Sequence, residues 1–245
     1  MIIPLFTITF LTLKVKYQDF GLREGNLYEI IATTYSITED GKKIKPNASC
    51  MGIRLMEDNQ IQISPFSSTA TYKNIKANST IAINFVDDVY LYALAALKER
   101  DSTIGLTEFP SEYYEFKYLE SRMMDVPYIK KAWGILICEV SQEYEKTKHN
   151  SFGEVVIPVF KLHPIFHEKF QESYKLFNRA ENLALESIIL ATRLKIAKKK
   201  NDRELFQKFH EKIRDHMKNI ERFGKNKDAL KTIALVSNYI SSLRD

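Results

Sequence analysis

The spacing of apolar residues changes partway along this chain, and the change restricts its possible folds more than any other feature. Before residue 163, short runs of alternating apolar and polar residues end in turn signals such as Asp58-Asn59, which is typical of β-strands and hairpins. After His163-Pro164, apolar residues recur at intervals of three and four, which is typical of amphipathic helices. We therefore predict an α+β protein with a β-rich domain at residues 1–162 and a helical domain at residues 163–245.

The β-rich part has the pattern of a barrel. Several short strands, joined by tight turns and few helices, imply a closed or nearly closed barrel, not a sheet of βαβ units. None of the eight glycines forms a Gly-x-Gly-x-x-Gly pattern, so a Rossmann dinucleotide site is not supported. We predict strands over 27–37, 48–55, 61–66, 79–85, 112–119, 133–145 and 153–162, and helices over 71–77, 88–97, 165–200, 203–222 and 228–243.

Charge and cysteine content argue against several classes of protein. The net charge of +5 is a mild excess over 245 residues and does not by itself indicate a nucleic-acid partner. Cys50 and Cys138 have neither the number nor the spacing of a disulfide framework or a zinc site, which fits a reducing cytoplasm. His163 and His167 have Pro164 between them and no evident third ligand, so no metal site is expected.

Residues 1–13 are apolar, like the core of an export signal. They lack a basic start and a small-residue cleavage site, and they are too short to span a bilayer. Alternating threonines favour a strand, or an extension packed on the core, so no membrane partner is expected.

The segment 64–74 has the composition of a phosphate pocket, because it joins a strand to a short helix through hydroxyls and one lysine. Unpaired N–H groups at the start of a helix attract anions, and Ser67, Ser68, Thr69, Thr71 and Lys73 all lie near that start. The alternative is an ordinary helix cap, for which Ser and Thr are preferred on local grounds alone.

The strand before this segment offers a second candidate contact. Small residues over 46–52 let a planar ring approach the backbone closely, and Asn47 and Ser49 supply hydrogen bonds for its polar edge. A plain hairpin strand with a glycine bulge explains the same residues equally well.

Other polar groups have simpler explanations. Asp87 and Asp88 form a possible acid/base pair, but capping of the next helix is favoured. On the long helix predicted over 165–200, Asn182 and Glu186 fit a solvated face. The basic run 198–200 fits a solvated helix end better than a nucleic-acid contact, because no aromatic residues are interleaved with it.

The order of several motifs resembles that of the FMN-binding split-barrel family classed as domain of unknown function 447. The resemblance extends from about residue 21 to the C-terminus and keeps the motif order. The matching blocks are Tyr28-Glu-Ile-Ile-Ala-Thr-Thr-Tyr35, Pro46-Asn-Ala-Ser-Cys-Met-Gly52, Pro65-Phe-Ser-Ser-Thr-Ala-Thr-Tyr-Lys-Asn74, Asn84-Phe-Val-Asp-Asp88 with Ala95-Ala-Leu97, and Phe177-Asn178 through Ala191-Thr-Arg193.

This resemblance implies a homodimeric split barrel like those of flavin reductases and pyridoxine-phosphate oxidases, with FMN near the subunit interface. By position, it implies that Thr69, Thr71 and Lys73 hold the phosphate. It places the remaining contacts in three groups: Asn47, Ala48, Ser49 and Met51 along the isoalloxazine ring, Ser64, Phe66 and Ser67 between ring and phosphate, and Arg193 on the long helix. The chain departs from the family where Ser67-Ser68 replaces a frequent basic residue, and where Ser49-Cys50 replaces the usual Ala-Pro.

The expected activity is that of a flavin-dependent oxidoreductase acting on an unidentified small molecule. The flavin itself would carry the electrons, and no side chain stands out as a catalytic acid or base. A module that holds FMN, or another phosphorylated ligand, without turning anything over is the alternative. The expected partners are a second copy of the chain and a small-molecule substrate or electron donor.

Overall fold

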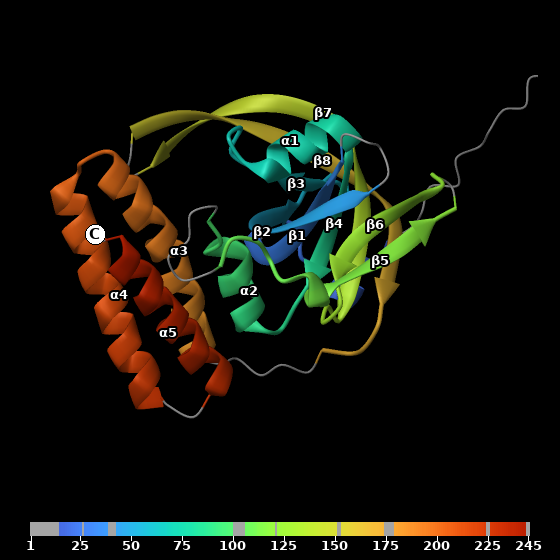
Figure 1. Cartoon of the computed structure of the whole chain (residues 1–245). Helices are drawn as coiled ribbons and strands as arrows, with labels where there is room; N and C mark the ends of the chain where they lie inside the picture. The colour runs from blue at the N-terminus through green and yellow to red at the C-terminus, as the bar shows by residue number, and fades with distance from the viewer. Residues whose placement is uncertain are drawn as a thin grey trace, which may run out of the picture.

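A computed structural model of the chain describes residues 15–25, 27–38, 43–99, 106–120, 122–150, 153–173, 179–223 and 226–243. The strand or extension expected within residues 1–13 lies outside the described residues. Figure 1 shows a β-barrel on one side of the molecule and a layer of long helices on the other.

Six antiparallel strands close the barrel in the order β1-β2-β3-β8-β7-β4. Alternation of apolar residues drives this arrangement, because every second side chain of a strand points to the same face. The strands are β1 (Leu27–Ile37), β2 (Ile44–Leu55), β3 (Ile61–Ile63), β4 (Thr80–Phe85), β7 (Gly134–Asn150) and β8 (Gly153–Lys169).

The pairing between β2 and β3 is short. These two strands pair only at Arg54 with Gln62 and at Leu55 with Ile61, so most of the β2 edge is not paired with β3. Helix α1 (Ala70–Asn78) closes this end of the barrel, with Ile75 buried among the interior residues. The long β7–β8 hairpin arches over α1 (Figure 1) and is joined to it by an ion pair of Lys76 with Glu143.

The helical layer lies against the outside of the barrel. Helix α3 packs on α4 and α5, and α2 packs on α3, α5 and β2. The separate hairpin β5–β6 covers another part of the barrel, where β6 contacts β1 and β4. These elements are α2 (Val89–Ala96), β5 (Tyr114–Leu119), β6 (Met124–Ile129), α3 (Arg179–Lys199), α4 (Arg203–Phe223) and α5 (Lys227–Ser242), with short 3-10 turns at Tyr17–Phe20 and Ser111–Tyr113.

The apolar residues form two separate cores. One fills the barrel and includes Ile30, Ile53 and Ile83, which have 2% exposure or less. The other lies between the barrel, the helices and the β5–β6 hairpin, and includes Leu91 and Ile188. Because the second core takes residues from both parts of the chain, the helices bury their apolar faces on the outer face of the barrel.

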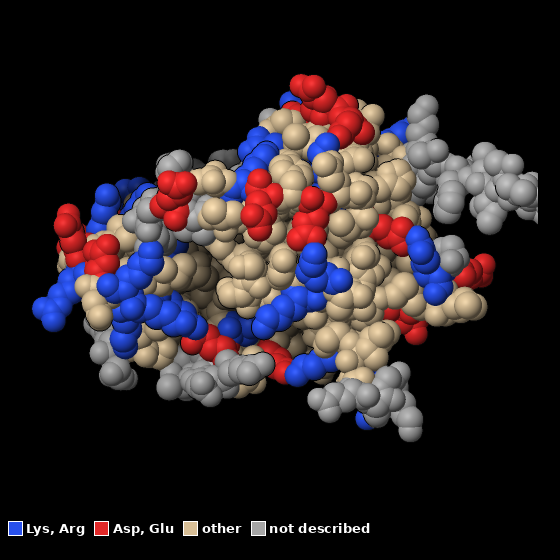
Figure 2. Space-filling model, turned by 90° about the horizontal axis from the view of Figure 1, so that it is seen from above, with Lys and Arg blue, Asp and Glu red and all other residues tan. Residues whose placement is uncertain are grey.

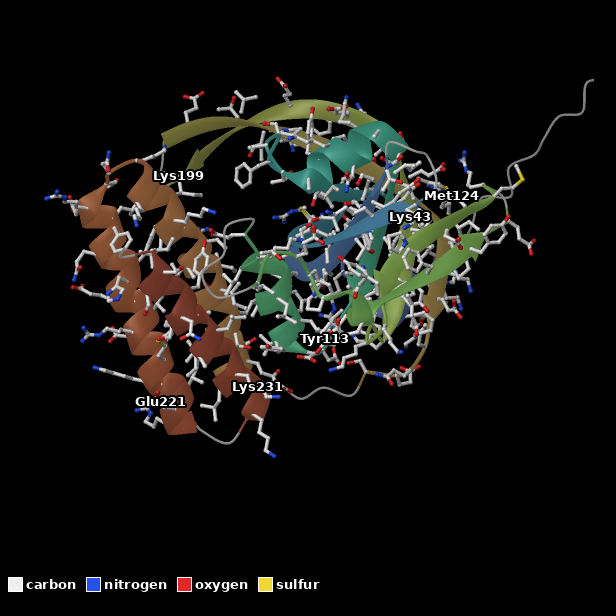
Figure 3. All side chains as sticks on the ribbon, in the orientation of Figure 1. Lys43, Tyr113, Met124, Lys199, Glu221 and Lys231 are labelled. Carbon is white, nitrogen blue, oxygen red and sulfur yellow. The ribbon has the colours of Figure 1, made fainter. Side chains whose placement is uncertain are left out.

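Labelled side chains show how far these parts are separated (Figure 3). Lys43 and Met124 lie on the side of the barrel away from the helices, while Lys199 and Glu221 lie toward opposite ends of the α3–α4 pair. Lys199 is exposed at the end of its helix, as predicted for the basic run. None of the helices in the described ranges is both long enough and apolar enough to cross a membrane.

Most predicted elements are confirmed in type, but several predictions were wrong in detail. The helix predicted over 165–200 begins only at Arg179, because β8 continues through Lys169 and pairs with β7 there. Strand β6 was missed, since Pro127 argues against a strand. Strand β3 ends at Ile63, three residues before the predicted end. The predicted domain boundary at 162/163 falls inside β8, and the division into two domains stays a prediction.

Candidate functional site

Neutral polar side chains gather where α1 meets β1 and β2. The hydroxyl oxygens of Ser49 and Thr71 lie 2.7 Å apart, and Asn47 Nδ2 donates to Thr71 Oγ1 at 3.2 Å. Asn74 Nδ2 donates to Thr34 Oγ1 at 3.1 Å, and Asn47 Nδ2 lies 3.4 Å from the same oxygen. We call Thr34, Asn47, Ser49, Thr71 and Asn74 the polar cluster. Because its members hydrogen-bond to one another, the cluster fixes α1 against β1 and β2.

Lys98 joins this cluster from the residues that follow α2. Its Nζ donates to Asn47 Oδ1 at 2.9 Å and also to the Ala48 carbonyl oxygen on β2. Burial lowers the pKa of Lys98 to about 8, against smaller upward effects of Cys50 and Glu108. The side chain therefore places a largely buried positive charge against the edge of β2.

The start of α1 is capped locally. Thr69 is the N-cap, and its Oγ1 accepts from the Tyr72 backbone N–H at 3.2 Å while donating to the Phe66 carbonyl at 2.7 Å. Thr71 is 2% exposed and points toward the polar cluster, whereas Lys73 is exposed. Side chains two apart on a helix point in different directions. The capping alternative is thus observed at Thr69, and the role of these residues in holding phosphate stays a prediction.

A cavity of about 580 Å³ lies between the barrel and helix α3. It brings together Ser49 of β2, Phe66 of the loop before α1, and Arg193 of α3, which are far apart in the sequence. Seen from above, the surface is hollowed between the helices and the barrel (Figure 2). We call it the β2–α3 cavity; its lining is Glu29, Ser49, Cys50, Phe66, Ala95, Ala96, Leu185, Ile188, Ile189, Thr192, Arg193 and Ile196.

Two acidic groups of this lining, the Glu29 carboxyl and the Cys50 thiol, have raised pKa values, which favour their uncharged forms. Burial, with a smaller contribution from Glu186, raises the pKa of the Glu29 carboxyl. Burial raises the pKa of the Cys50 thiol to about 12, and its Sγ donates to the Tyr92 carbonyl at 3.2 Å. Cys50 is therefore a packing residue, not a thiolate nucleophile, at neutral pH.

Comparison with models of protein families shows to which family this chain belongs. The family model described as protein of unknown function (DUF447), N-terminal domain, matches residues 28–158, which is more than half of the chain. The chain belongs to the DUF447 family. The matched region contains five of the six barrel strands and only the first part of β8, and helices α3, α4 and α5 of this DUF447 protein lie beyond it.

One solved structure shares the fold over most of its length. A crystal structure of an FMN-bound DUF447 protein from Methanosarcina mazei is 22% identical, has a TM-score of 0.68, and matches 91% of this chain and 98% of its own. Flavoredoxin from Methanosarcina acetivorans is 18% identical over 61% of this chain and 72% of its own, with a TM-score of 0.42. The NADH:FAD oxidoreductase of Streptomyces globisporus is 12% identical over 58% and 76%, with a TM-score of 0.39. No curated protein matches the sequence.

The other predicted site residues of this DUF447 protein occupy different environments. Met51 is 9% exposed and belongs to the barrel interior, while Ala48 is fully buried in the core beneath the helices. Ser64 is half-buried, and Ser67 and Ser68 are exposed. The β2–α3 cavity therefore unites Ser49, Phe66 and Arg193 of the predicted set, and the polar cluster unites Asn47, Ser49 and Thr71.

Alternatives raised from the sequence now have structural explanations. Asp88 Oδ1 accepts from the Tyr90 backbone N–H at 2.9 Å and caps α2, while Asp87 Oδ2 accepts from the Ser173 hydroxyl. His163 and His167 lie on strand β8. Within the described ranges, no group of three or more His, Cys, Asp or Glu side chains is placed to hold a metal ion.

Sequence reasoning missed Lys98 and Glu29, which the fold places at the site. Lys98 follows the apolar helix α2 and its C-cap Leu97, so a change from apolar to basic was the available signal. Glu29 is the one acid within the otherwise uncharged strand β1. Neither signal indicates a site on its own, because helix ends and strand faces often carry exposed charges.

Proposed function

We propose that this DUF447 protein binds FMN in the β2–α3 cavity and acts as a flavin-dependent oxidoreductase on a small molecule. The observation that carries the proposal is the convergence of Ser49, Phe66 and Arg193 on one cavity of about 580 Å³. This volume lies within the range of sites for small molecules and cofactors. The fold shared with an FMN-bound relative over most of both chains supports the choice of ligand.

The lining of the cavity matches the chemistry of a flavin. Leu185, Ile188 and Ile196 supply apolar surface for the faces of a ring system, and Ser49 and Arg193 supply polar groups for its rim. Hydrophobic faces with a few fixed polar contacts are what hold and orient such a ring.

The phosphate would be held at the start of α1. The N–H groups of a first helical turn attract an anion, and the neighbouring hydroxyls and Lys73 add hydrogen bonds and charge without any metal. In this proposal Thr69, Thr71 and Lys73 hold the phosphate, and Ser64 and Ser67 lie between phosphate and ring. Asn47, Ala48 and Met51 belong to the strand along the ring.

Bound FMN supplies reversible electron transfer, which the side chains of this chain do not provide. The chain's residues bind and orient the flavin, and the apolar surface of α3 excludes water from it. We include in the proposal a homodimer with FMN near the subunit interface and a cytoplasmic location; the support for both is the resemblance between the sequence motifs and this family.

Flavin content and affinity test the binding proposal. The purified protein is expected to release FMN on denaturation, identified by its absorbance and chromatographic mobility. Arg193→Ala and Lys73→Ala are each expected to weaken FMN binding by about tenfold or more, since a lost charged contact costs about 1.5–3 kcal/mol. Lys231→Ala is the matched control, because Lys231 is exposed on α5 (Figure 3) and does not line the β2–α3 cavity.

The outcomes separate the proposal from its alternatives. FMN titrations followed by fluorescence quenching should give equal affinities for the wild-type protein and Lys231→Ala. Unchanged affinity in both test variants would place FMN elsewhere. Anaerobic NADH or NADPH should bleach the flavin absorbance of a reductase; persistent yellow colour with both donors would leave a binding module without nicotinamide-dependent turnover.

A further inference from the structure

A second cavity of about 380 Å³ lies on the other side of the polar cluster. The start of β2, the first turn of α1 and residues 107–109 surround it. It shares no lining residue with the β2–α3 cavity. Of the polar cluster, Asn47 lines this second cavity and Ser49 lines the β2–α3 cavity. We call it the Lys98 cavity; the lining residues used below are Asn47, Lys98, Glu99, Glu108, Phe109 and Tyr114.

The charges around the Lys98 cavity are unevenly matched. Glu108 pairs with Lys45 at 2.5 Å, and Glu99 pairs with Lys195 at 2.7 Å. The acceptors of Lys98, by contrast, are the uncharged oxygens of Asn47 and Ala48. Both carboxylates of the lining thus have a cation of their own, while the buried ammonium is held by neutral groups.

A buried ammonium without an acidic partner is unfavourable, because the loss of water is not repaid by an opposite charge. Glu108 acts on Lys98 only as a weaker influence, smaller than burial. An anion entering the cavity would supply the missing opposite charge. Phe109 and Tyr114 line the same cavity and offer aromatic surface to the rest of such a molecule.

We propose that the Lys98 cavity is a binding site, separate from the β2–α3 cavity, for a small molecule that carries one carboxylate or phosphate on a planar apolar body. Lys98 pairs with the oxyanion, and Phe109 and Tyr114 contact the body. Asn47 bonds to both Lys98 and Thr71, and Thr71 in turn bonds to Ser49 of the β2–α3 cavity.

Competitive labelling of the wild-type protein tests the site without any substitution. Trace acetic anhydride at pH 8 acetylates accessible uncharged amines, and peptide mass spectrometry reports each lysine separately. Saturating benzoate or inorganic phosphate is expected to slow acetylation of Lys98 by severalfold, because a paired ammonium loses its proton less readily. Lys231, exposed on α5, should react equally with and without the probe. Protection by benzoate identifies a carboxylate site and protection by phosphate a phosphate site; absence of protection by both overturns the proposal.

Calorimetric titration with the protecting probe provides the second measurement. Lys98→Met is expected to weaken binding by about tenfold or more, whereas Lys98→Arg retains the charge and most of the affinity. Equal affinity in Lys98→Met and wild type would overturn the proposal. Near-ultraviolet circular dichroism checks that each variant keeps its tertiary packing, and the labelling result stands if Lys98→Met does not fold.

Saturation with FMN separates this site from the proposed flavin site. Probe affinity should be the same with and without FMN. Loss of probe binding on FMN saturation would make the Lys98 cavity part of the flavin site and overturn a separate one. A protein that binds no FMN but still shows Lys98 protection would refute the proposed function and leave this inference intact.

Discussion

The barrel interior and the layer between barrel and helices are both apolar, yet they differ in what else they contain. The interior holds packed side chains such as Ile53 and Ile83, both fully buried. The interlayer holds apolar residues such as Leu91 together with the ionisable groups of Lys98 and Glu29 and a cavity of about 580 Å³. Within the described residues, the interlayer therefore combines space for a ligand with charges to recognise one.

This difference follows from how each region is closed. Neighbouring strands hydrogen-bond along their length, so the barrel brings its inward side chains to close packing. The interlayer forms where curved helices meet a curved sheet, and such surfaces leave gaps at their margins. Asn84 shows what a fully buried polar side chain requires. Its amide is hydrogen-bonded to Ile31, Thr33, Ala82 and Ile129.

Truncation of one isoleucine in each region tests the comparison most strongly. Ile53→Ala should lower the free energy of unfolding by about 3–5 kcal/mol, because it leaves a closed void in the interior. Ile188→Ala should cost about 2–3 kcal/mol, because Ile188 lines the β2–α3 cavity and its loss only enlarges existing space. Urea unfolding of both variants measures the difference.

The two curves must have similar slopes for this reading to hold, since the slope reports the surface exposed on unfolding. An equal or larger cost at Ile188 would mean that the interlayer is packed as tightly as the barrel. The wild-type protein unfolded under the same conditions provides the reference.

The charge on Lys98 gives the interlayer a pH dependence between about pH 8 and 10.5. Its pKa is about 8 in the folded protein and 10.5 ordinarily, so the unfolded chain binds more protons between these values. Below pH 8 the cost of burying the charged ammonium lowers the stability of the folded state in full. This cost disappears as the pH rises from about 8 to 10.5, so the stability rises over that range. At 1.36 kcal/mol per unit, this relief is about 3 kcal/mol.

Lys98→Met should remove this contribution, so the stability of wild type relative to the variant should rise by about 3 kcal/mol across that window. Urea unfolding of both proteins at pH 7.5 and 10.5 measures the rise. Comparing each protein with itself at two pH values cancels effects of the substitution that do not depend on pH. A constant difference between the two proteins would show that Lys98 is not desolvated as the fold implies.

The smallest effect is expected at the ion pair of Lys45 and Glu108 on the rim of the Lys98 cavity. Their side chains are 61% and 65% exposed, and exposed pairs contribute about 0–1 kcal/mol. Lys45→Ala should therefore change the urea midpoint little at pH 7.5 and even less in 0.5 M salt. A loss as large as that of Ile188→Ala would show that this rim is part of the packed interlayer.

Local sequence patterns predicted most of the barrel. The strand over 27–37 is observed with the same bounds, and the helix predicted over 203–222 is observed as Arg203–Phe223. Residues 165–169 were misassigned, because the spacing of Phe166 and Phe170 suits a helix while pairing of β8 with β7 decides for a strand. Hydrogen bonds to a distant strand leave no trace in local spacing.

Candidate site residues were predictable where a family motif marks them and not where the fold alone assembles them. Ser49, Phe66 and Arg193 were predicted as cofactor contacts, and they line one cavity. Lys98 was not, because its burial depends on β2, α1 and the segment near Glu108, none of which is adjacent to it in sequence.

The sequence by itself determined the type of most elements, the barrel class and the family motifs, because these depend on residue periodicity and on short ordered blocks. The tertiary structure alone decided where β8 ends, that Thr71 points inward while Lys73 stays exposed, and that α3 closes a cavity over β2. It also decided the state of Lys98, since the pKa of a side chain depends on the water and charges that surrounding segments remove or supply.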